Sequence, residues 1–139
     1  MRSALQRVIL GAVPELVANG KFDVDAASWT ANGSTLAAVD GQLEITSTGA
    51  GFAARALQSF ATSVGATYRL TLDSLTVGNA IRVGTTAAGV DVVPNTGIGV
   101  VSGYVVFFVA LSTTTHIGLI GSAVLNGKNY FDNVSCRRR

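Results

Sequence analysis

The sequence is poor in the residues that crosslink proteins, bind metals and carry charge. Of 139 residues, one is cysteine, one is histidine and two are proline, and only 13% are charged. A single cysteine excludes an internal disulfide and a multi-cysteine zinc site. The longest apolar run, residues 100–111, is shorter than the roughly 18 residues that a membrane helix needs, and Ser102 and Gly103 interrupt it. We therefore expect neither a disulfide scaffold nor an integral membrane protein, and no membrane partner.

Apolar residues are abundant instead. They make up 48% of the chain, and the mean hydropathy is +0.44. A chain of this length forms one domain and buries about two-thirds of its unfolded surface. The composition predicts a domain with more exposed apolar surface than a lone monomer tolerates, which neighbouring molecules would cover.

Basic residues are concentrated at the two ends of the chain. Between Glu15 and Cys136 there are five basic and eight acidic residues, a net charge of −3. A nucleic-acid-binding face would gather lysine and arginine on one structured surface, so we expect no nucleic-acid partner. The terminal arginines are predicted to contact an acidic protein surface: Arg2, Arg7, Arg137, Arg138 and Arg139. The alternative is that they only keep an apolar body soluble.

The N-terminal segment resembles a signal peptide only weakly. Its apolar stretch, residues 8–13, has six residues, whereas a signal peptide needs about 7–15. We expect an extended arm over residues 1–14 that is retained, and synthesis in the cytoplasm of a host cell.

From residue 15 onward the pattern is that of short strands. Valine, threonine, isoleucine and aromatic residues alternate, and glycine, asparagine, aspartate and serine interrupt them every eight to twelve residues. Asp40-Gly41 and Asn126-Gly127 are typical of two-residue hairpins. Ten strands are predicted, over residues 15–22, 35–39, 42–46, 51–60, 67–75, 81–85, 90–93, 99–111, 116–123 and 130–137. The fold class is all-β: a two-sheet antiparallel jelly-roll β-sandwich over residues 15–136, with a basic C-terminal tail over residues 137–139.

Two of these segments are apolar on both faces, residues 51–60 and 99–111. A strand of an antiparallel sandwich normally shows one polar face to water. Loops or a second subunit must cover the outer face, and the pattern predicts a homo-oligomer.

Catalytic motifs are absent. His116 lies in a predicted strand without a nucleophile elbow or a metal-binding helix motif, so we interpret it as structural. Cys136 is interpreted as a small apolar residue of the last strand, although the adjacent arginines would activate it if it were exposed. We predict no enzymatic activity and no catalytic residues.

Motifs at both ends of the chain carry a family resemblance. The segment Leu16-Val17-Ala18-Asn19-Gly20-Lys21-Phe22 precedes Trp29, residues 65–70 read Gly-Ala-Thr-Tyr-Arg-Leu, and the chain closes on Tyr130-Phe131-Asp132-Asn133-Val134. In this order they resemble the galactose-binding-like jelly rolls, which include many carbohydrate-binding modules. The resemblance implies a β-sandwich whose first and last strands are adjacent.

The same resemblance implies a structural calcium ion near the opening turn and the closing aspartate. The corresponding residues are Asn19, Gly20 and Asp132, with Asp23 as a neighbour. Calcium takes six to eight oxygen ligands, and the sequence identifies only a few of them. The alternative is that these residues only form hydrogen bonds where the chain ends meet. No other cofactor is expected.

Two functions follow from these observations. The first is a structural protein of a virus (phage) particle, a capsid decoration or cement protein that self-associates and binds the major capsid protein at the virion surface. The alternative is a carbohydrate-binding module, or a tail-fibre or baseplate accessory that binds glycans. The motif aromatics are usually core residues, so the sequence identifies no carbohydrate-binding residue.

Overall fold

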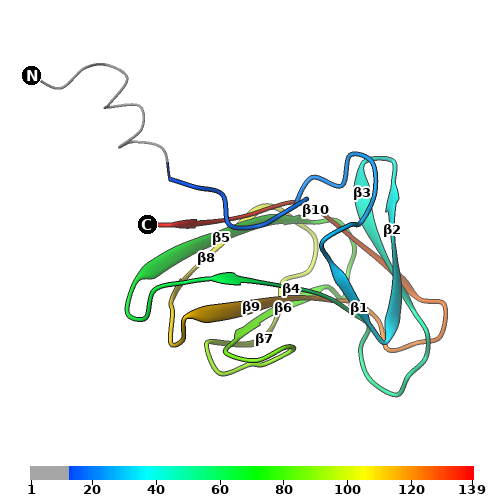
Figure 1. The fold of residues 1–139 in the computed structure, drawn as a ribbon. Coiled ribbons are helices and arrows are strands. Elements are labelled where there is room, and N and C mark those ends of the chain that lie inside the picture. Colours follow the sequence, from blue (N-terminus) through cyan, green and yellow to red (C-terminus); the bar gives the residue numbers. More distant parts are fainter. Residues whose placement is uncertain (1–12) are drawn as a thin grey trace, which may run out of the picture.

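The computed structural model describes residues 13–139, which form two antiparallel five-stranded sheets packed face to face (Figure 1). Within this part of the chain, no helix is long and apolar enough to cross a membrane. The predicted two-sheet β-sandwich is confirmed. The strands are β1 Thr30–Asn32, β2 Ser34–Val39, β3 Gln42–Ser47, β4 Arg55–Ala61, β5 Thr67–Ser74, β6 Ala80–Gly84, β7 Val93–Gly97, β8 Val101–Val109, β9 Thr114–Ile120 and β10 Lys128–Arg138.

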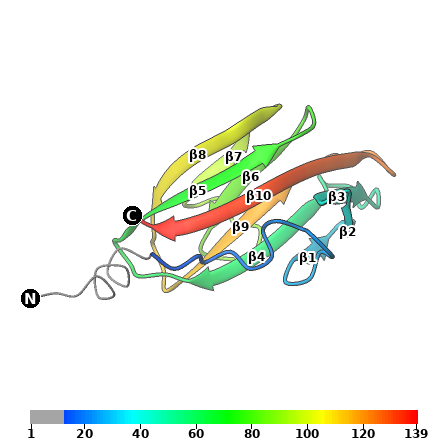
Figure 2. The same ribbon diagram turned by 90° about the horizontal axis from the view of Figure 1, so that it is seen from above.

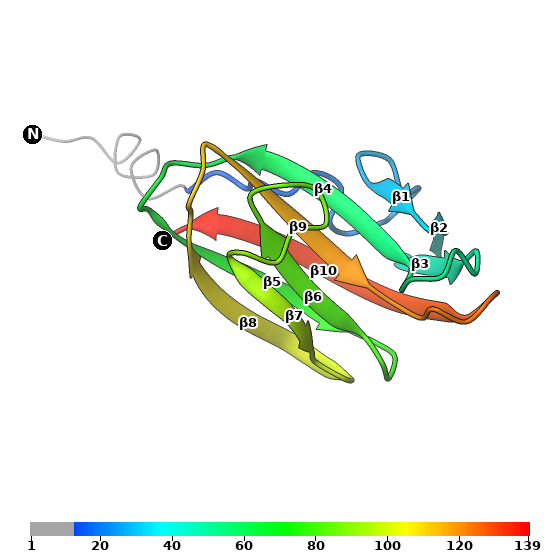
Figure 3. The same cartoon turned by 90° about the horizontal axis from the view of Figure 1, so that it is seen from below.

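The strand orders are β1-β4-β9-β6-β7 in the first sheet and β2-β3-β10-β5-β8 in the second. Figure 2 views the molecule from the side of β10, β5 and β8, and Figure 3 from the side of β4, β9 and β6. Each sheet therefore has one face in the core and one outer face.

Alternating apolar residues of both sheets fill the space between them. Phe22 and Trp29, from the segment before β1, join this core with their ring centroids 5.7 Å apart. The largest fully buried apolar side chains are Phe22, Phe131, Leu43, Ile45, Leu70, Leu72, Ile81, Ile117 and Leu119.

The predicted strand over residues 15–22 is wrong. Asn19 and Phe22 have φ values of 50° and 51°, which interrupt an extended conformation. The segment nevertheless lies along β10, since the Leu16 amide donates to the Cys136 carbonyl and the Val134 amide to the Gly20 carbonyl, both at 2.9 Å. The adjacency of the two chain ends that the resemblance implied is therefore present without a regular ladder.

The two predicted hairpins have different outcomes. Asp40 and Gly41, with φ values of 53° and 74°, turn β2 directly into β3. The hairpin at Asn126-Gly127 is wrong, because β9 and β10 belong to different sheets and this turn lies on the connection between them.

Other strands also differ from the prediction. β1 was not predicted, and β4 and β8 begin later than the predicted strands 51–60 and 99–111. The strand expected at 90–93 forms later, as β7, and contains Pro94. A proline is tolerated there because β7 is an edge strand and needs few ladder donors. At the C-terminus Arg137 and Arg138 belong to β10, so the basic residues continue the strand.

Candidate ligand-binding face

The outer face of the first sheet carries polar side chains from all five of its strands. On β4, Arg55, Leu57 and Ser59 alternate with core-facing residues, and on β6 Arg82 lies between the fully buried Ile81 and Val83. The strand register places Leu57 and Arg82 on either side of Gly118 of β9. We call the surface made by Thr30, Asn32, Arg55, Leu57, Ser59, Arg82, Asn95 and His116 the arginine face.

A hollow of about 200 Å³ lies on the arginine face. It is lined by Thr30, Leu57, Gln58, Ser59, Ala87 and His116. Ala87 comes from the loop of residues 85–92, which folds back over the sheet: a Cβ atom on Gly84 would lie only 2.5 Å from the Gly89 carbonyl carbon. The hollow thus has an apolar floor at Leu57 and a polar rim.

Arg55 is held by an aromatic ring and an amide. Its guanidinium carbon lies 4.5 Å from the centroid of the Phe52 ring, and Nη1 donates to Asn32 Oδ1 at 3.1 Å. Its Nε atom is buried and has no hydrogen-bond partner among the described residues. One donor of this guanidinium therefore lacks an acceptor.

Arg82 is also held by neutral acceptors. Nη2 and Nε donate to Asn95 Oδ1 at 2.9 and 3.3 Å, and Nη1 donates to the Ala88 carbonyl at 3.2 Å. Burial lowers the pKa of Arg82, and the positive charge of Arg55 lowers it further. Both arginines thus keep their positive charges on the same face without an acidic partner among the described residues.

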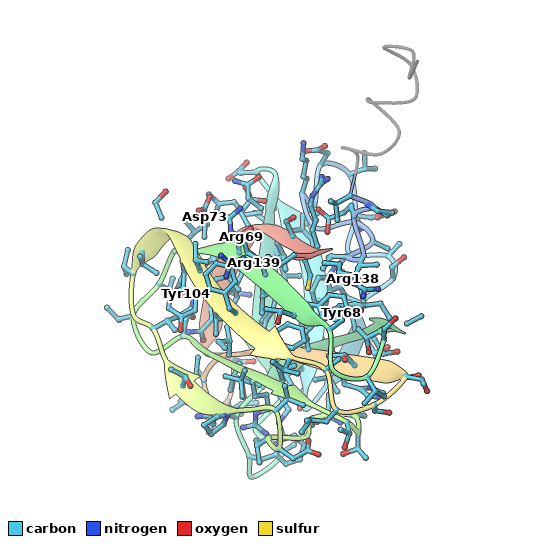
Figure 4. The ribbon with its side chains drawn as sticks, turned by 90° about the vertical axis from the view of Figure 1, so that its left-hand side faces the viewer. Tyr68, Arg69, Asp73, Tyr104, Arg138 and Arg139 are labelled. Atoms are coloured by element: carbon cyan, nitrogen blue, oxygen red, sulfur yellow. The ribbon has the colours of Figure 1, made fainter. Side chains whose placement is uncertain are left out.

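The outer face of the second sheet has a larger hollow, of about 310 Å³, between β5, β8 and β10. Its most polar group is already engaged: Asp73 Oδ1 accepts from the Gly103 amide at 2.7 Å, and Oδ2 accepts from Asn133 Nδ2 at 2.8 Å. Figure 4 shows Arg69, Asp73 and Arg139 on this side of the molecule.

A row of exposed apolar side chains lies along the edge strand β8 and continues to Leu111, two residues after its end. Phe107 and Leu111 are 47% and 55% exposed, and Val105 and Val109 are similarly open. Phe107 is partly shielded by Arg139, whose guanidinium carbon lies 4.8 Å from the ring centroid. We call Val105, Phe107, Val109 and Leu111 the β8 strip. It confirms that the outer face of this segment is apolar, and no described residue covers it completely.

The residues predicted to bind calcium lie near one another but are engaged in hydrogen bonds. The Asn19 backbone carbonyl accepts from the Trp29 indole at 3.1 Å. The side-chain Nδ2 of Asn19 donates to Asp25 Oδ1 and to the backbone carbonyls of Asp25 and Ala27. The Gly20 carbonyl accepts from Val134. Among residues 13–139, no three histidine, cysteine, aspartate or glutamate side chains gather as a metal site. Asp132 Oδ1 accepts from the Asn133 amide at 2.8 Å. These hydrogen bonds agree with the alternative that the residues bond where the chain ends meet, and calcium binding stays a prediction.

Three of the five terminal arginines belong to the residues that the structure describes. Arg2 and Arg7 lie outside the described residues. Arg137 pairs with Glu15 at 3.6 Å and donates to the Val13 carbonyl at 2.7 Å, while Arg138 donates to Ser63 Oγ at 3.5 Å. Contact with an acidic partner stays a prediction.

Cys136 is fully buried in the core. Burial, together with the smaller effect of the nearby charge of Glu15, raises the pKa of its thiol to about 12. The interpretation as a core residue is confirmed, because the side chain points away from the neighbouring arginines.

Sequence reasoning missed the arginine face. The interpretation of residues 51–60 as apolar on both faces is wrong for β4, because Arg55 and Ser59 lie on its outer face. His116 was interpreted as a structural strand residue. The available signal was that Arg55 and Arg82 each sit at an outer position between two buried ones. Without the strand order, nothing indicates that β4 and β6 both flank β9.

Comparison with known proteins gives a likeness of fold. No protein-family model matches the chain, and no curated protein matches its sequence. A tailspike protein 4 domain of bacteriophage CBA120 superimposes with a TM-score of 0.64 at 16% identity, over 90% of this chain and 21% of that one. The chain therefore spans about a fifth of that tailspike structure.

Carbohydrate-binding modules match over nearly their whole length. The second N-terminal cellulose-binding domain of Cellulomonas fimi β-1,4-glucanase C has a TM-score of 0.61 at 14% identity, over 91% of this chain and 95% of that one. A CBM4 structure has a TM-score of 0.60 at 15% identity, over 88% and 99%. The chain thus has the jelly-roll β-sandwich fold that is found in carbohydrate-binding modules.

Proposed function

We propose that the protein is a non-catalytic carbohydrate-binding module whose ligand lies on the arginine face. The fold likeness supports this proposal, because it extends over almost the entire length of modules that are named for binding cellulose or carbohydrate. The observation that carries it is the hollow over Leu57, where an apolar floor is surrounded by polar side chains from three strands. Ligand sites commonly combine such a surface with a few convergent polar groups.

The arginine face suits a sugar better than the larger hollow on the opposite sheet. Thr30, Ser59 and His116 make no side-chain hydrogen bond to another described residue, so their polar atoms are free to meet sugar hydroxyls. On the opposite sheet, both carboxylate oxygens of Asp73 already accept hydrogen bonds. A ligand there would have to displace them, which leaves polar groups unpaired.

The test is a glycan array followed by titration calorimetry on the best ligand. We expect the wild-type chain to bind a glycan. The double variant Ser59→Ala/His116→Ala should lose about tenfold or more in affinity, since it removes two polar partners of the sugar. The matched control is Thr71→Ala, which alters the hollow on the other sheet. Failure of the array to give any ligand, or equal losses in both proteins, would contradict the proposal.

The second candidate is the structural protein of a virus particle, and the β8 strip favours it. An edge strand with an open apolar face is a surface on which a second copy or a shell protein can pack. Light scattering after size exclusion separates the candidates: a stable oligomer supports assembly, and a monomer of 14.2 kDa that binds glycans supports the module.

A further inference from the structure

The arginine face carries two arginines on the strands that flank β9, at positions diagonal to each other. Arg55 of β4 lies opposite Ile120 of β9, and Arg82 of β6 lies opposite Gly118, two residues away on the same face of β9. A Cβ atom on Gly118 would lie 3.0 Å from Cγ of Arg82 and 3.3 Å from Cδ2 of Leu57. The glycine therefore lets the aliphatic stem of Arg82 and the side chain of Leu57 pack over β9.

Both guanidinium groups are fixed before any ligand arrives. Arg55 packs on the Phe52 ring, which in turn lies against Gly33, where a Cβ atom would come within 2.5 Å of the ring. Arg82 is fixed by Asn95 and by the carbonyl of Ala88. Fixed donors lose less conformational entropy on binding than flexible ones.

Their charge is not neutralised within the described part of the chain. The ion pairs among residues 13–139 are Lys128–Glu44 and Arg137–Glu15, and neither involves this face. Asn32, Asn95 and Ala88 supply only neutral oxygens, and Nε of Arg55 has no acceptor. Two positive charges on one face of the sheet, each with neutral partners only, favour binding of an anionic ligand.

We propose that the arginine face selects acidic glycans, with Arg55 and Arg82 each donating hydrogen bonds to a carboxylate of a chain that contains uronic acids. This proposal rests on the proposed function. Arginine presents a planar fork of N–H donors that matches a carboxylate, and such charge-assisted bonds are stronger than neutral ones. The hollow over Leu57 then receives the neighbouring sugar ring, with Thr30, Ser59 and His116 at its rim.

The experiment is affinity electrophoresis of the full chain through gels that contain an acidic polysaccharide or its neutral, carboxyl-reduced counterpart. Polygalacturonate, alginate and hyaluronan are the acidic members, and dextran sulfate serves as a polyanion without carboxylates. We expect retention by at least one uronic-acid polymer that exceeds retention by its reduced form at least tenfold and that falls as salt is added.

Variants locate the effect on the protein. Arg55→Gln and Arg82→Gln should each weaken retention by about tenfold, whereas Arg55→Lys and Arg82→Lys should weaken it less, because they keep the charge and lose the fork. Arg69→Gln is the matched control, since it removes the same charge from the exposed outer face of the other sheet. Circular dichroism melting checks that each variant is folded, and the reduced polymers test the proposal on the wild-type chain alone.

The outcomes are distinct. Equal retention by acidic and reduced polymers, or an equal loss for Arg69→Gln, overturns the carboxylate proposal and leaves glycan binding intact. Retention by dextran sulfate alone also overturns it. No retention by any polymer, together with an empty glycan array, overturns the proposed function as well.

Discussion

The arginine face and the β8 strip both place apolar side chains on the outside of a sheet, but only the arginine face covers them. Leu57 is 8% exposed because Arg82 and the loop of residues 85–92 fold over that part of the sheet. Phe107, on the β8 strip, is 47% exposed, and only Arg139 partly shields it. The same alternation of residues in the sequence can therefore lead to a structured hollow or to an open apolar surface, depending on which neighbours reach over it.

The two outer faces also treat charge differently. On the second sheet Glu44 accepts from Lys128 at 3.2 Å and from the Tyr130 hydroxyl at 2.7 Å, so the charge is compensated internally. On the arginine face the two positive groups have neutral partners only. The comparison teaches that a ligand is more readily inferred from charges without counter-ions than from the size of a hollow, which is larger on the second sheet.

The largest effect is expected for Gly84→Ala, which breaks the cover of the arginine face. A Cβ atom there would overlap Gly89, so the loop of residues 85–92 must move. We expect the free energy of unfolding to fall by about 1–3 kcal/mol, measured by urea denaturation, together with loss of glycan retention. Gly97→Ala is the control, because nothing lies within 4 Å of its added Cβ atom. Equal stability of the two variants would show that the loop is not packed on the sheet.

The β8 strip is tested by Phe107→Glu. If the open apolar row is an association surface, the wild-type chain forms oligomers at high concentration, and the glutamate weakens them by about tenfold or more because it places a charge in an apolar contact. Light scattering gives the mass, which should fall towards 14.2 kDa. Val77→Glu is the control, since Val77 is 80% exposed outside the strip. A wild-type chain that stays monomeric at every concentration would contradict this prediction.

The internal compensation of charge on the second sheet is tested by pH. The Tyr130 hydroxyl, and to a lesser extent Lys128, hold the pKa of Glu44 below its usual value of 4.5. A carboxyl with a lowered pKa in the folded state stabilises the fold above about pH 4.5, and this contribution is lost as the pH falls through the folded pKa. Glu44→Gln should lose about 0.2–1 kcal/mol at pH 7 and little at pH 3, measured by urea denaturation.

Tyr130→Phe should reproduce part of that loss, because it removes the hydroxyl that donates to Glu44. The same loss at pH 3 as at pH 7 would show that Glu44 acts through packing and not through its charge.

The smallest effect is expected for Asp132→Asn. Burial raises the pKa of Asp132, and the charges of Asp73 and Asp23 raise it further. A raised folded pKa stabilises the fold at low pH, and this contribution is lost as the pH rises through it. The variant should therefore gain up to about 0.5 kcal/mol at pH 7 and nothing at pH 3.

The same variant tests the calcium prediction. If Asp132 is not a calcium ligand, EDTA leaves the melting temperature of the wild-type chain unchanged and the gain at pH 7 persists in added calcium. A wild-type melting temperature that drops in EDTA, with no such drop in Asp132→Asn, would support the metal site.

The sequence predicted the sandwich well because strand alternation and turn residues are local signals. The hairpin at Asp40-Gly41 depends on two adjacent residues that accept positive φ, and it formed as expected. The strand predicted at 15–22 failed because Asn19 and Phe22 take positive φ values. The hydrogen bonds that Leu16 and Gly20 make instead are to residues of β10, far away in the sequence.

The candidate site was not predictable for a related reason. Arg55 and Arg82 become neighbours only because β9 lies between β4 and β6, and β9 follows both of them in the chain. Even Gly118, which permits the approach of Arg82, looks in the sequence like an ordinary glycine in a strand. Strand order, and not residue type, creates this site.

The burial of Cys136 makes the rate of thiol labelling a measure of how often the folded sandwich opens. Its thiol is fully buried in the core and protonated at neutral pH, so a thiol reagent can react only after the sandwich opens around β10. The rate of labelling then counts the opening events of the sandwich in the unmodified chain, with no engineered probe. A ligand that binds the arginine face would lower the labelling rate without contacting the cysteine, because binding to the closed state alone makes opening rarer.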